Sequence, residues 1–464
     1  MSGRSEGRSG CRGGVALVAI CVAYFMVILD TTVVNVALPS LGRSLHTTTT
    51  ALEWVVDAYS LVFAALLLTG GALSDRRGAR GVFQAGIAYF TAASAACGLA
   101  PSVSWLIAAR CAQGFGAALA VPASLALIQA AFPGVAERRR AFGIWGGIAG
   151  IAAGAGPVLG GALVAGLGWR AVFFVNLPIG LAGIALGARH LPRPHPRPHG
   201  PDPAGQVAGV VVLGSLTAAL VEAGALGWSS LLVVSCLVVC AVSGAAFVAI
   251  ERRSASPMLP LGLFPSPQFS GAVGVGGLIN LGFYGELFVL TLYLQTQLHL
   301  SALAAGVALL PQMAMATVGS TVAGRVTARY GPRPVMLTGL VLGAAGLAGL
   351  AVTAGTHQAY FVLVAPLVAT GFGMAFTMPA ATAAAMEAAP SERGGLASGT
   401  LNAARQAGGV VGVALLGTLV AGGTDFAGAM QVAMAIAAAA FAVGALVTAV
   451  TVMSGGHSQP PVAD

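Results

Sequence analysis

The sequence predicts an all-α protein that crosses a membrane many times. Hydrophobic residues make up 57% of its 464 residues and charged residues only 8%, whereas an ordinary soluble domain carries about 25% charged residues. Apolar runs of the roughly 20 residues that a helix needs to cross a bilayer recur along the whole chain. Because backbone groups in the hydrocarbon core must be hydrogen-bonded within their own segment, each run is predicted to be a helix.

We count fourteen such spans, separated by short loops with Pro, Gly or charge. They are 15–37, 52–74, 82–100, 105–132, 141–163, 171–188, 207–226, 231–250, 269–294, 302–327, 335–353, 360–385, 397–420 and 427–452. The predicted organisation is a tail (1–14), a six-helix bundle (15–189), a Pro-, His- and Arg-rich linker (190–206), an inserted helix pair (207–250), a second linker (251–268), a second six-helix bundle (269–453) and a C-terminal tail (454–464).

Arginine placement predicts the orientation. All 22 basic residues are arginine, and 18 of them fall in the N-terminal tail or in loops that follow even-numbered spans. The positive-inside rule then predicts that both termini and these loops are cytoplasmic, in a multi-pass protein of the cell membrane. The net charge of +8 is explained by topology, so no nucleic-acid partner is expected.

No enzyme or metal signature accompanies the spans. There is no phosphate-binding loop, and the six cysteines have neither disulfide-framework nor metal-ligand spacing. The stretch from His190 to Gly200 could be considered a metal site, but its prolines favour a stiff linker. We expect no enzyme activity, no metal and no cofactor.

The two ends of the chain are related by a repeat. Gly114, Phe115, Gly116, Pro122 and Pro133 recur at an offset of 257, as Gly371, Phe372, Gly373, Pro379 and Pro390. Gly71, Arg76, Gly78 and Arg80 recur at an offset of 253, as Gly324, Arg329, Gly331 and Arg333. Repeated halves with a binding site between them are typical of transporters.

Ionisable residues at membrane depth are costly and indicate function. Asp30 lies inside the first span, where Thr31, Thr32 and Asn35 could hydrogen-bond it, and Glu286 occupies the equivalent depth in the second half. A carboxyl group in a low dielectric can bind and release protons near neutral pH. We predict proton coupling by Asp30, and by Glu286 with weaker support, the alternative being a structural polar cluster.

Three further charged residues are candidates for proton coupling. Arg110 in the fourth span needs an acidic partner, which Asp30 or Asp57 could supply. Glu53 and Asp57 are one helical turn apart near the outer end of the second span, where acids are also typical of a solvated helix start. That solvated interpretation is favoured for Glu53 and left open for Asp57. Glu222, near the outer end of the seventh span, is the weakest candidate.

Two glycine-containing segments indicate mechanical roles. In the loop after the second span, Asp75, Arg76 and Arg80 with the turn residues Gly71 and Gly78 suit a cytoplasmic gate, the alternative being a topology signal alone. In the fifth span Gly143, Gly147, Gly150, Gly154, Pro157 and Gly161 fall at steps of three and four. This predicts one side-chain-free stripe that lets a neighbouring helix approach closely, with a kink at Pro157.

These segments together resemble the major facilitator superfamily, and within it the fourteen-span drug:proton antiporters related to methylenomycin resistance exporters. Gly71 to Gly78 is similar to the superfamily's loop motif, Arg110 to Gly114 to its fourth-span motif, and Leu29 to Pro39 to the first span of that branch. Gly154, Gly156, Pro157, Gly160 and Gly161 resemble the antiporter motif, although Ala152 replaces its leading glycine. In the second half Ala328 replaces the loop motif's aspartate, so only the first copy is expected to form a full gate.

The resemblance implies export of hydrophobic or amphipathic drugs in exchange for protons, by alternating access and driven by the proton-motive force. Polar residues expected to line the substrate cavity are Asn35, Gln113, Asn280, Tyr284, Asn402 and Arg405. The expected partners are the bilayer, the substrate and protons, and the expected state is a monomer. An importer or uniporter of a small nutrient is the alternative, and a membrane sensor is a weaker one.

Overall fold

The computed structural model describes residues 3–132, 134–193, 202–254, 257, 259, 261–354, 360–389, 394–421 and 425–452. Residues 194–201 of the Pro-, His- and Arg-rich linker and the whole C-terminal tail lie outside these ranges. Within them every regular element is a helix, and thirteen helices are long and apolar enough to span a bilayer. The prediction of an all-α polytopic protein is confirmed.

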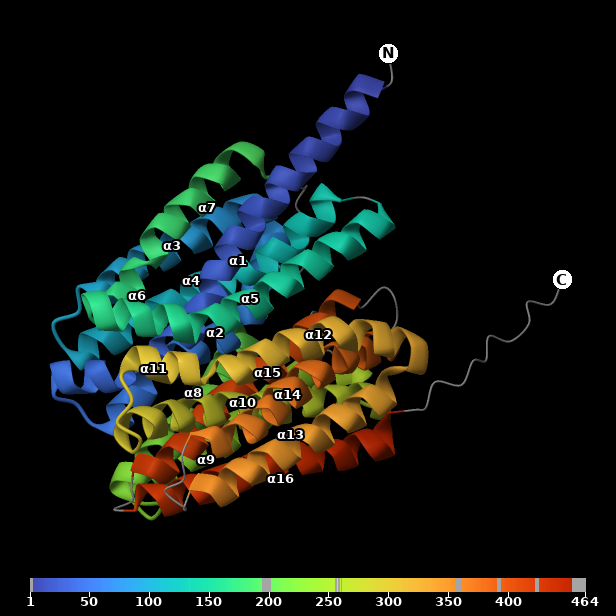
Figure 1. The fold of residues 1–464 in the computed structure, drawn as a ribbon. Helices are drawn as coiled ribbons and strands as arrows, with labels where there is room; N and C mark the ends of the chain where they lie inside the picture. Colours follow the sequence, from blue (N-terminus) through green and yellow to red (C-terminus); the bar gives the residue numbers. More distant parts are fainter. Residues whose placement is uncertain are drawn as a thin grey trace.

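The first half of the chain forms one bundle of antiparallel helices (Figure 1). Its elements are α1 (Gly3–Leu45), α2 (Thr49–Arg77), α3 (Ala79–Gly98), α4 (Val103–Ala131), α5 (Val135–Leu167), α6 (Ala171–Phe174) and α7 (Asn176–His190). The short α6 and α7 together make one candidate span. Helix α3 corresponds to the predicted span 82–100 and packs against α4 and α7, but it is not among the thirteen candidate spans.

The second half forms a matching bundle. Its elements are η1 (Leu261–Leu263), α10 (Pro267–Thr296), α11 (Ala302–Ala308), α12 (Leu310–Tyr330), α13 (Pro332–Ala354), α14 (Phe361–Glu387), α15 (Gly394–Ala421) and α16 (Phe426–Thr451). Helices α11 and α12 make one candidate span that is broken at Leu309.

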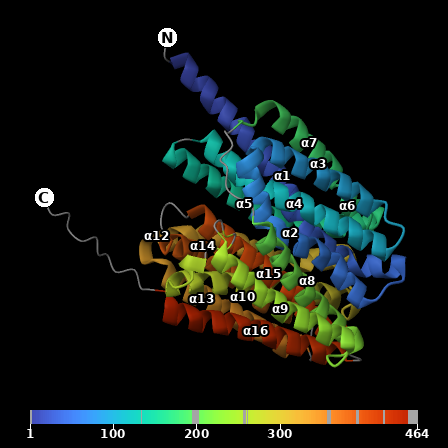
Figure 2. The ribbon, with the colours of Figure 1, turned by 180° about the vertical axis from the view of Figure 1, so that it is seen from behind.

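The predicted inserted pair is formed by α8 (Pro203–Leu226) and α9 (Leu231–Arg253). Helix α8 packs against α2 of the first bundle and α15 of the second. Helix α9 packs on α8, and only 6% of its most apolar stretch is buried. In Figure 2 the pair lies on the outside, against the seam between the bundles. Its apolar outer face therefore suits contact with lipid.

The repeat predicted from sequence is visible in the packing of backbones. Gly114 on α4 lies against the backbone of Tyr59 on α2, and Gly371 on α14 lies against Gln312 on α12 in the same way. A Cβ at either glycine would overlap those backbone atoms. Each half therefore uses glycine at the same place to bring two helices together.

The helix ends differ in charge. One end of the helix bundles, here called the Arg-rich end, carries eight arginines: Arg76, Arg77, Arg80, Arg189, Arg252, Arg253, Arg329 and Arg333. The opposite end, here called the Arg-poor end, carries Arg43 and Arg170. The two bundles converge toward the Arg-poor end (Figure 1). There the amide of Gln295 on α10 donates to the carbonyl oxygen of Val36 on α1, at 3.0 Å.

Candidate functional site

The centre of the candidate site is an ion pair buried inside the first bundle. Arg110 Nη1 on α4 donates to Asp30 Oδ2 on α1. The Asp30 side chain is 0% exposed and that of Arg110 is 1% exposed. Of the two acidic partners considered for Arg110, the structure selects Asp30. Two charges removed from solvent at membrane depth are stable only with further hydrogen bonds around them.

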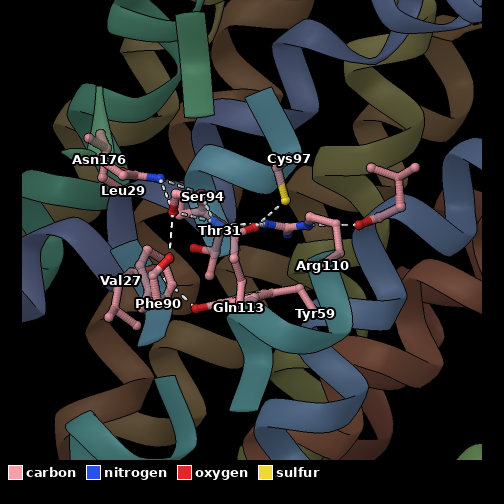
Figure 3. A network of polar contacts seen from close by, with 12 residues as sticks. Val27, Leu29, Thr31, Tyr59, Phe90, Ser94, Cys97, Arg110, Gln113 and Asn176 are labelled. Carbon is pink, nitrogen blue, oxygen red and sulfur yellow. Dashed lines mark hydrogen bonds and ion pairs between the residues drawn. The ribbon is translucent and has the colours of Figure 1, made fainter. Parts of the chain in front are cut away.

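Side chains from three other elements supply those hydrogen bonds (Figure 3). Asp30 Oδ1 accepts from Gln113 Nε2 at 3.2 Å and from Asn176 Nδ2 at 2.8 Å. Both amides also donate to Ser94 Oγ, at 2.7 Å from Gln113 and 3.3 Å from Asn176. Asp30 therefore joins α1 directly to α4 and α7, and Ser94 attaches α3 to this network through the two amides.

Arg110 has further contacts besides Asp30 that hold it in place, including a bond from its Nη1 to Gln113 Oε1 on its own helix at 3.0 Å. Its Nε donates to the carbonyl oxygen of Val55 on α2 at 2.9 Å. Its guanidinium lies over the ring of Tyr59, 4.4 Å from the ring centre, where a cation is attracted by the aromatic face. Arg110 would thus remain held by α2 if Asp30 became neutral.

Some expected partners of Asp30 are wrong. Thr31 and Thr32 donate to carbonyl oxygens of their own helix, Ile28 and Leu29. Asn35 donates to the carbonyl oxygen of Thr31 at 3.0 Å. Residues one, two or five positions along a helix do not share a face with Asp30, so these side chains bond nearby backbone carbonyl oxygens instead of the carboxylate.

Sequence reasoning missed three members of this network: Ser94, Cys97 and Tyr59. Cys97 donates its S–H to Gln113 Oε1 at 3.1 Å, and the Tyr59 hydroxyl donates to the carbonyl oxygen of Val27 at 3.2 Å. Small or aromatic side chains of this kind are common in spans, so no pattern marked them. Asn176 did carry a signal, as a polar residue within an apolar run.

Glu53 and Asp57 are both buried, which corrects the expectation of a solvated helix start. Both side chains are 0% exposed, although α2 begins only four residues before Glu53. No carboxylate oxygen of either residue has a hydrogen-bond partner among the described residues. The second bundle covers this part of α2 through α15, which the sequence pattern of α2 alone could not indicate.

Glu286 on α10 is fully buried in the second half, but its surroundings differ from those of Asp30. Its Oε1 accepts from Gln312 Nε2 at 2.9 Å, and Oε2 has no partner among the described residues. At the repeat offset, Leu367 replaces Arg110, and it is 0% exposed. The second half therefore holds its acid with an amide and not with a cation.

The residues expected in a substrate cavity do not form one cluster. Gln113 is 0% exposed and belongs to the Asp30 network, while Asn35 is 3% exposed and its Oδ1 has no partner. Three residues gather around Met378 in the second half: Asn280 contacts its sulfur, Arg405 Nη2 donates to its carbonyl oxygen at 3.0 Å, and Asn402 accepts from Arg405 at 3.5 Å.

Tyr284 and Arg405 face the first half of the chain. The ring of Tyr284 packs against Gly409 of α15, and both Tyr284 and Arg405 interact electrostatically with Tyr24 on α1. Among the expected cavity residues, these two are the ones placed toward the other bundle.

Glu222 is half-buried on α8, and its Oε1 accepts a hydrogen bond from Trp54 Nε1 of α2 at 2.9 Å. Near the other end of α8, Gln206 donates to the carbonyl oxygen of Ala65 at 2.6 Å and also bonds Thr69. These bonds attach the inserted pair to the first bundle.

The expected gate residues lie at the junction of α2 and α3. Gly78 has φ +92°, a backbone conformation that favours glycine. Arg80 donates to the carbonyl oxygens of Ala188 at 2.6 Å and Leu191 at 3.2 Å, and so closes the end of α7. Arg76 is exposed. Asp75 lies on the last turns of α2, and Gly71 lies near Pro122 on α4.

The predicted glycine stripe on α5 faces the second bundle at Gly154, Pro157 and Gly161, and two further glycines of α5 form a second seam on another face. Gly156 and Gly160 lie against Thr32 and Val33 of α1, whereas Gly161 lies against Ala302 of α11, where an added Cβ would be 2.6 Å from the carbonyl oxygen. Gly154 faces Met313 of α12. Gly147 and Gly150 have nothing within 4 Å of the position of a Cβ, and Gly143 lies where side-chain surroundings are not described.

The comparison with known sequences identifies the family. Residues 20–289 and 274–461 match the Major Facilitator Superfamily. The chain belongs to that superfamily. It is 38% identical to the Methylenomycin A resistance protein of Streptomyces coelicolor over 90% of this chain and 88% of that protein.

Two further Streptomyces proteins are similar over most of their length. The Tetracenomycin C resistance and export protein of Streptomyces glaucescens is 37% identical over 89% of this chain and 77% of its own. The Puromycin resistance protein of Streptomyces alboniger is 40% identical over 88% of this chain and 82% of its own.

Solved structures match the fold at low sequence identity. A POT family transporter in complex with a thioalcohol-conjugated peptide has a TM-score of 0.71 at 14% identity, over 93% of this chain and 95% of that one. A bacterial homologue of the human lysosomal transporter Spinster has a TM-score of 0.65 at 16% identity, over 94% and 96% of the two chains. The predicted major facilitator fold is confirmed, and the family indicates a transporter and not an enzyme.

Proposed function

We propose that this protein exports hydrophobic or amphipathic compounds from the cytoplasm in exchange for protons, by alternating access between its two bundles. The observation that carries the proposal is the Asp30–Arg110 pair, a carboxylate and a guanidinium buried together at membrane depth inside one bundle. Intramembrane pairs of this kind mark ion and proton pathways.

Protonation of Asp30 would change the contacts among three helices, α1, α4 and α7, at once. A neutral carboxyl group loses its attraction to Arg110, while the bonds of Gln113 and Asn176 to Oδ1 no longer act on a charge. Arg110 keeps Val55 and Tyr59 as partners. A proton on Asp30 therefore loosens α1 from α4 while it leaves Arg110 attached to α2.

The contacts between the bundles support a state closed at the Arg-poor end. Gly161 and Gly306 bring α5 and α11 into backbone contact there, and Gln295 bonds Val36. Nearer the Arg-rich end, Gly147 and Gly150 on α5 have no such neighbour. With the Arg-rich end in the cytoplasm, as the positive-inside rule requires, this arrangement is inward-facing and both termini are cytoplasmic.

The relatives indicate the substrate class. Their names refer to resistance to methylenomycin A, tetracenomycin C and puromycin, and this chain is similar to each over nearly its whole length. The driving force is adequate, because about 2.3 kcal/mol per charge per 100 mV corresponds to a gradient of roughly fifty-fold at about 1.4 kcal/mol per decade. No cofactor beyond the proton-motive force of the cell membrane is required, and a monomer suffices.

Transport into inverted vesicles tests the proposal. A sensitised host that expresses the protein is first screened for resistance to amphipathic antibiotics. Inverted vesicles that contain the protein are then given a proton gradient, and the uptake of each compound to which the protein confers resistance is measured. Uptake that collapses with a protonophore is expected. Uptake that is indifferent to the gradient indicates a uniporter, and gradient-driven movement in the opposite direction indicates an importer; either result contradicts the proposal.

A further inference from the structure

Glu53 is a buried acid that the mechanism above does not use. It lies on the second turn of α2, at the Arg-poor end, where the two bundles meet. Its side chain is 0% exposed, and neither carboxylate oxygen has a hydrogen-bond partner among the described residues. An ionised carboxylate in such a place is far more costly than a neutral acid.

The second bundle packs closely on the side chain of Glu53. Gly417 on α15 of the other bundle packs directly on the carboxyl group, and a Cβ there would be 2.7 Å from Glu53 Cδ. On the same α15 the neighbouring Thr418 bonds the carbonyl oxygen of Leu220 on α8. Helix α15 of the second bundle therefore covers the acid on α2 and is itself bonded to α8 of the insert, and protonation would remove the charge of the covered carboxylate.

The charged groups around Glu53 do not neutralise it. Asp57 on α2 and Glu222 on α8 interact electrostatically with it, and both are acids. The cations of the helices packed on α2 are occupied elsewhere or face solvent. Arg110 on α4 pairs with Asp30 on α1, and Arg80 on α3 bonds the end of α7. Arg405 on α15 bonds Met378 and Thr382. Arg43 in the last turn of α1 and His46 just after it are exposed.

We propose that Glu53 is a proton lock at the Arg-poor end, which must take up one proton for the two bundles to close there. The inference rests on the proposed alternating access. When the bundles separate at this end, Glu53 meets solvent and ionises, and the proton returns to the solution on that side. When they close, the carboxylate takes one proton from the same solution. The lock therefore makes closure proton-dependent without carrying a proton across the membrane.

The test measures the opening of the Arg-poor end as a function of pH. Spin labels at Leu99→Cys and Phe361→Cys report the distance between the bundles, because these residues, at the end of α3 and the start of α14, are 70% and 82% exposed on opposite halves. Native cysteines are replaced in a background that retains transport. The measurement uses full-length protein in nanodiscs, without substrate or gradient.

Lower pH is expected to favour the closed distance. Linkage to a single proton changes the equilibrium between open and closed by up to about tenfold per pH unit. Glu53→Gln, which binds no proton, is expected to reduce the slope by that one proton, and Glu53→Met is a second variant without a proton. Glu137→Gln, at an exposed acid of α5, is the matched control and is expected to keep the wild-type slope.

A wild-type slope in both Glu53 variants overturns the lock. A change in the number of protons exchanged per substrate in Glu53→Gln also overturns it, because the lock predicts an unchanged stoichiometry. The failure of the lock can be distinguished from the failure of the proposed function. Export without proton coupling contradicts antiport, even if the pH dependence of closure depends on Glu53. Proton-coupled export, together with an unaltered pH dependence in the Glu53 variants, contradicts only the lock.

Discussion

Gly306 of α11 lies directly on the backbone carbonyl of Pro157 of α5, so a contact between the two bundles is made without a side chain from Gly306. A Cβ at residue 306 would overlap that carbonyl group. Gly306→Ala is therefore expected to prevent closure at the Arg-poor end and to reduce export at least tenfold, with near-normal amounts of folded protein. Export assays with detergent-solubilised size-exclusion profiles would check both effects.

Gly150→Ala is the matched control, since it changes the same residue type on α5 where nothing lies within 4 Å. It is expected to leave export within about twofold, because Ala is also the better helix former by about 1 kcal/mol. Equal loss of export in both variants would show that the seam is not the critical contact.

Pro157 itself is expected to matter more for transport than for folding. Proline removes one backbone hydrogen bond of α5 and disfavours a straight helix, and its carbonyl group contacts Gly306. Pro157→Ala restores the helical bond and should slow or uncouple export while the melting temperature stays within a few degrees. Measuring export and passive proton leak in the same vesicles distinguishes slowed export from uncoupled export. A variant that unfolds more readily, while the protein that remains folded transports normally, would contradict the expectation.

The fold could be predicted from sequence because its signals are local. Runs of apolar residues require only a short window, and Arg placement and the recurrence of Gly114 as Gly371 require only a comparison of such windows along the chain. The glycines of α5 show the limit of that reasoning. Their spacing indicates close packing, but the division between α1 and α11 depends on how α5 sits between two bundles, which periodicity within one helix cannot specify.

The candidate site was predictable only in part, for a related reason. Asp30 and Arg110 were marked because charge at membrane depth is costly. Their partner amide Asn176 lies 146 positions from Asp30, and no sequence rule joins them. Glu53 was misjudged because its burial comes from α15, near Gly417. The partners of Asp30 and the burial of Glu53 were not predicted because distant elements, and not neighbours in the chain, supply these contacts.

Asp30→Asn is expected to abolish proton-coupled export with expression intact. The amide keeps an acceptor for Gln113 and Asn176 but removes the titratable group and leaves Arg110 without its counter-charge. Removal of one partner of a buried pair costs about 3–5 kcal/mol, and the retained hydrogen bonds place the loss at the lower limit. Thermal unfolding and vesicle transport would measure the two effects.

Asp425→Asn is the control for Asp30→Asn, since Asp425 is an exposed N-cap of α16 and Asn is an equally good cap. It should leave export unchanged. Undiminished energised transport by Asp30→Asn would remove Asp30 from the coupling mechanism.

Arg80 and Arg333 are expected to stabilise equivalent helix ends in the two halves. Arg80 bonds the carbonyl oxygen of Ala188 at the end of α7, and Arg333 bonds that of Ala449 at the end of α16, at 2.8 Å. Because both arginines are half-buried, each of Arg80→Gln and Arg333→Gln should cost about 1 kcal/mol. The melting temperatures of these two variants are expected to be a few degrees lower than that of the wild type. Arg76→Gln, at an exposed arginine, is the control and should leave the melting temperature unchanged.

Glu222 offers a choice between a proton carrier and a structural acceptor, and paired substitutions decide it. Trp54 donates to Glu222 at 2.9 Å, which joins α8 to α2. Glu222→Gln keeps an acceptor oxygen and loses the titratable group, whereas Glu222→Ala loses both. Retained coupling in Glu222→Gln with lower stability in Glu222→Ala is expected, since a side-chain hydrogen bond contributes about 1 kcal/mol. Loss of coupling in Glu222→Gln, with Trp54→Phe still active, would instead make Glu222 a proton carrier.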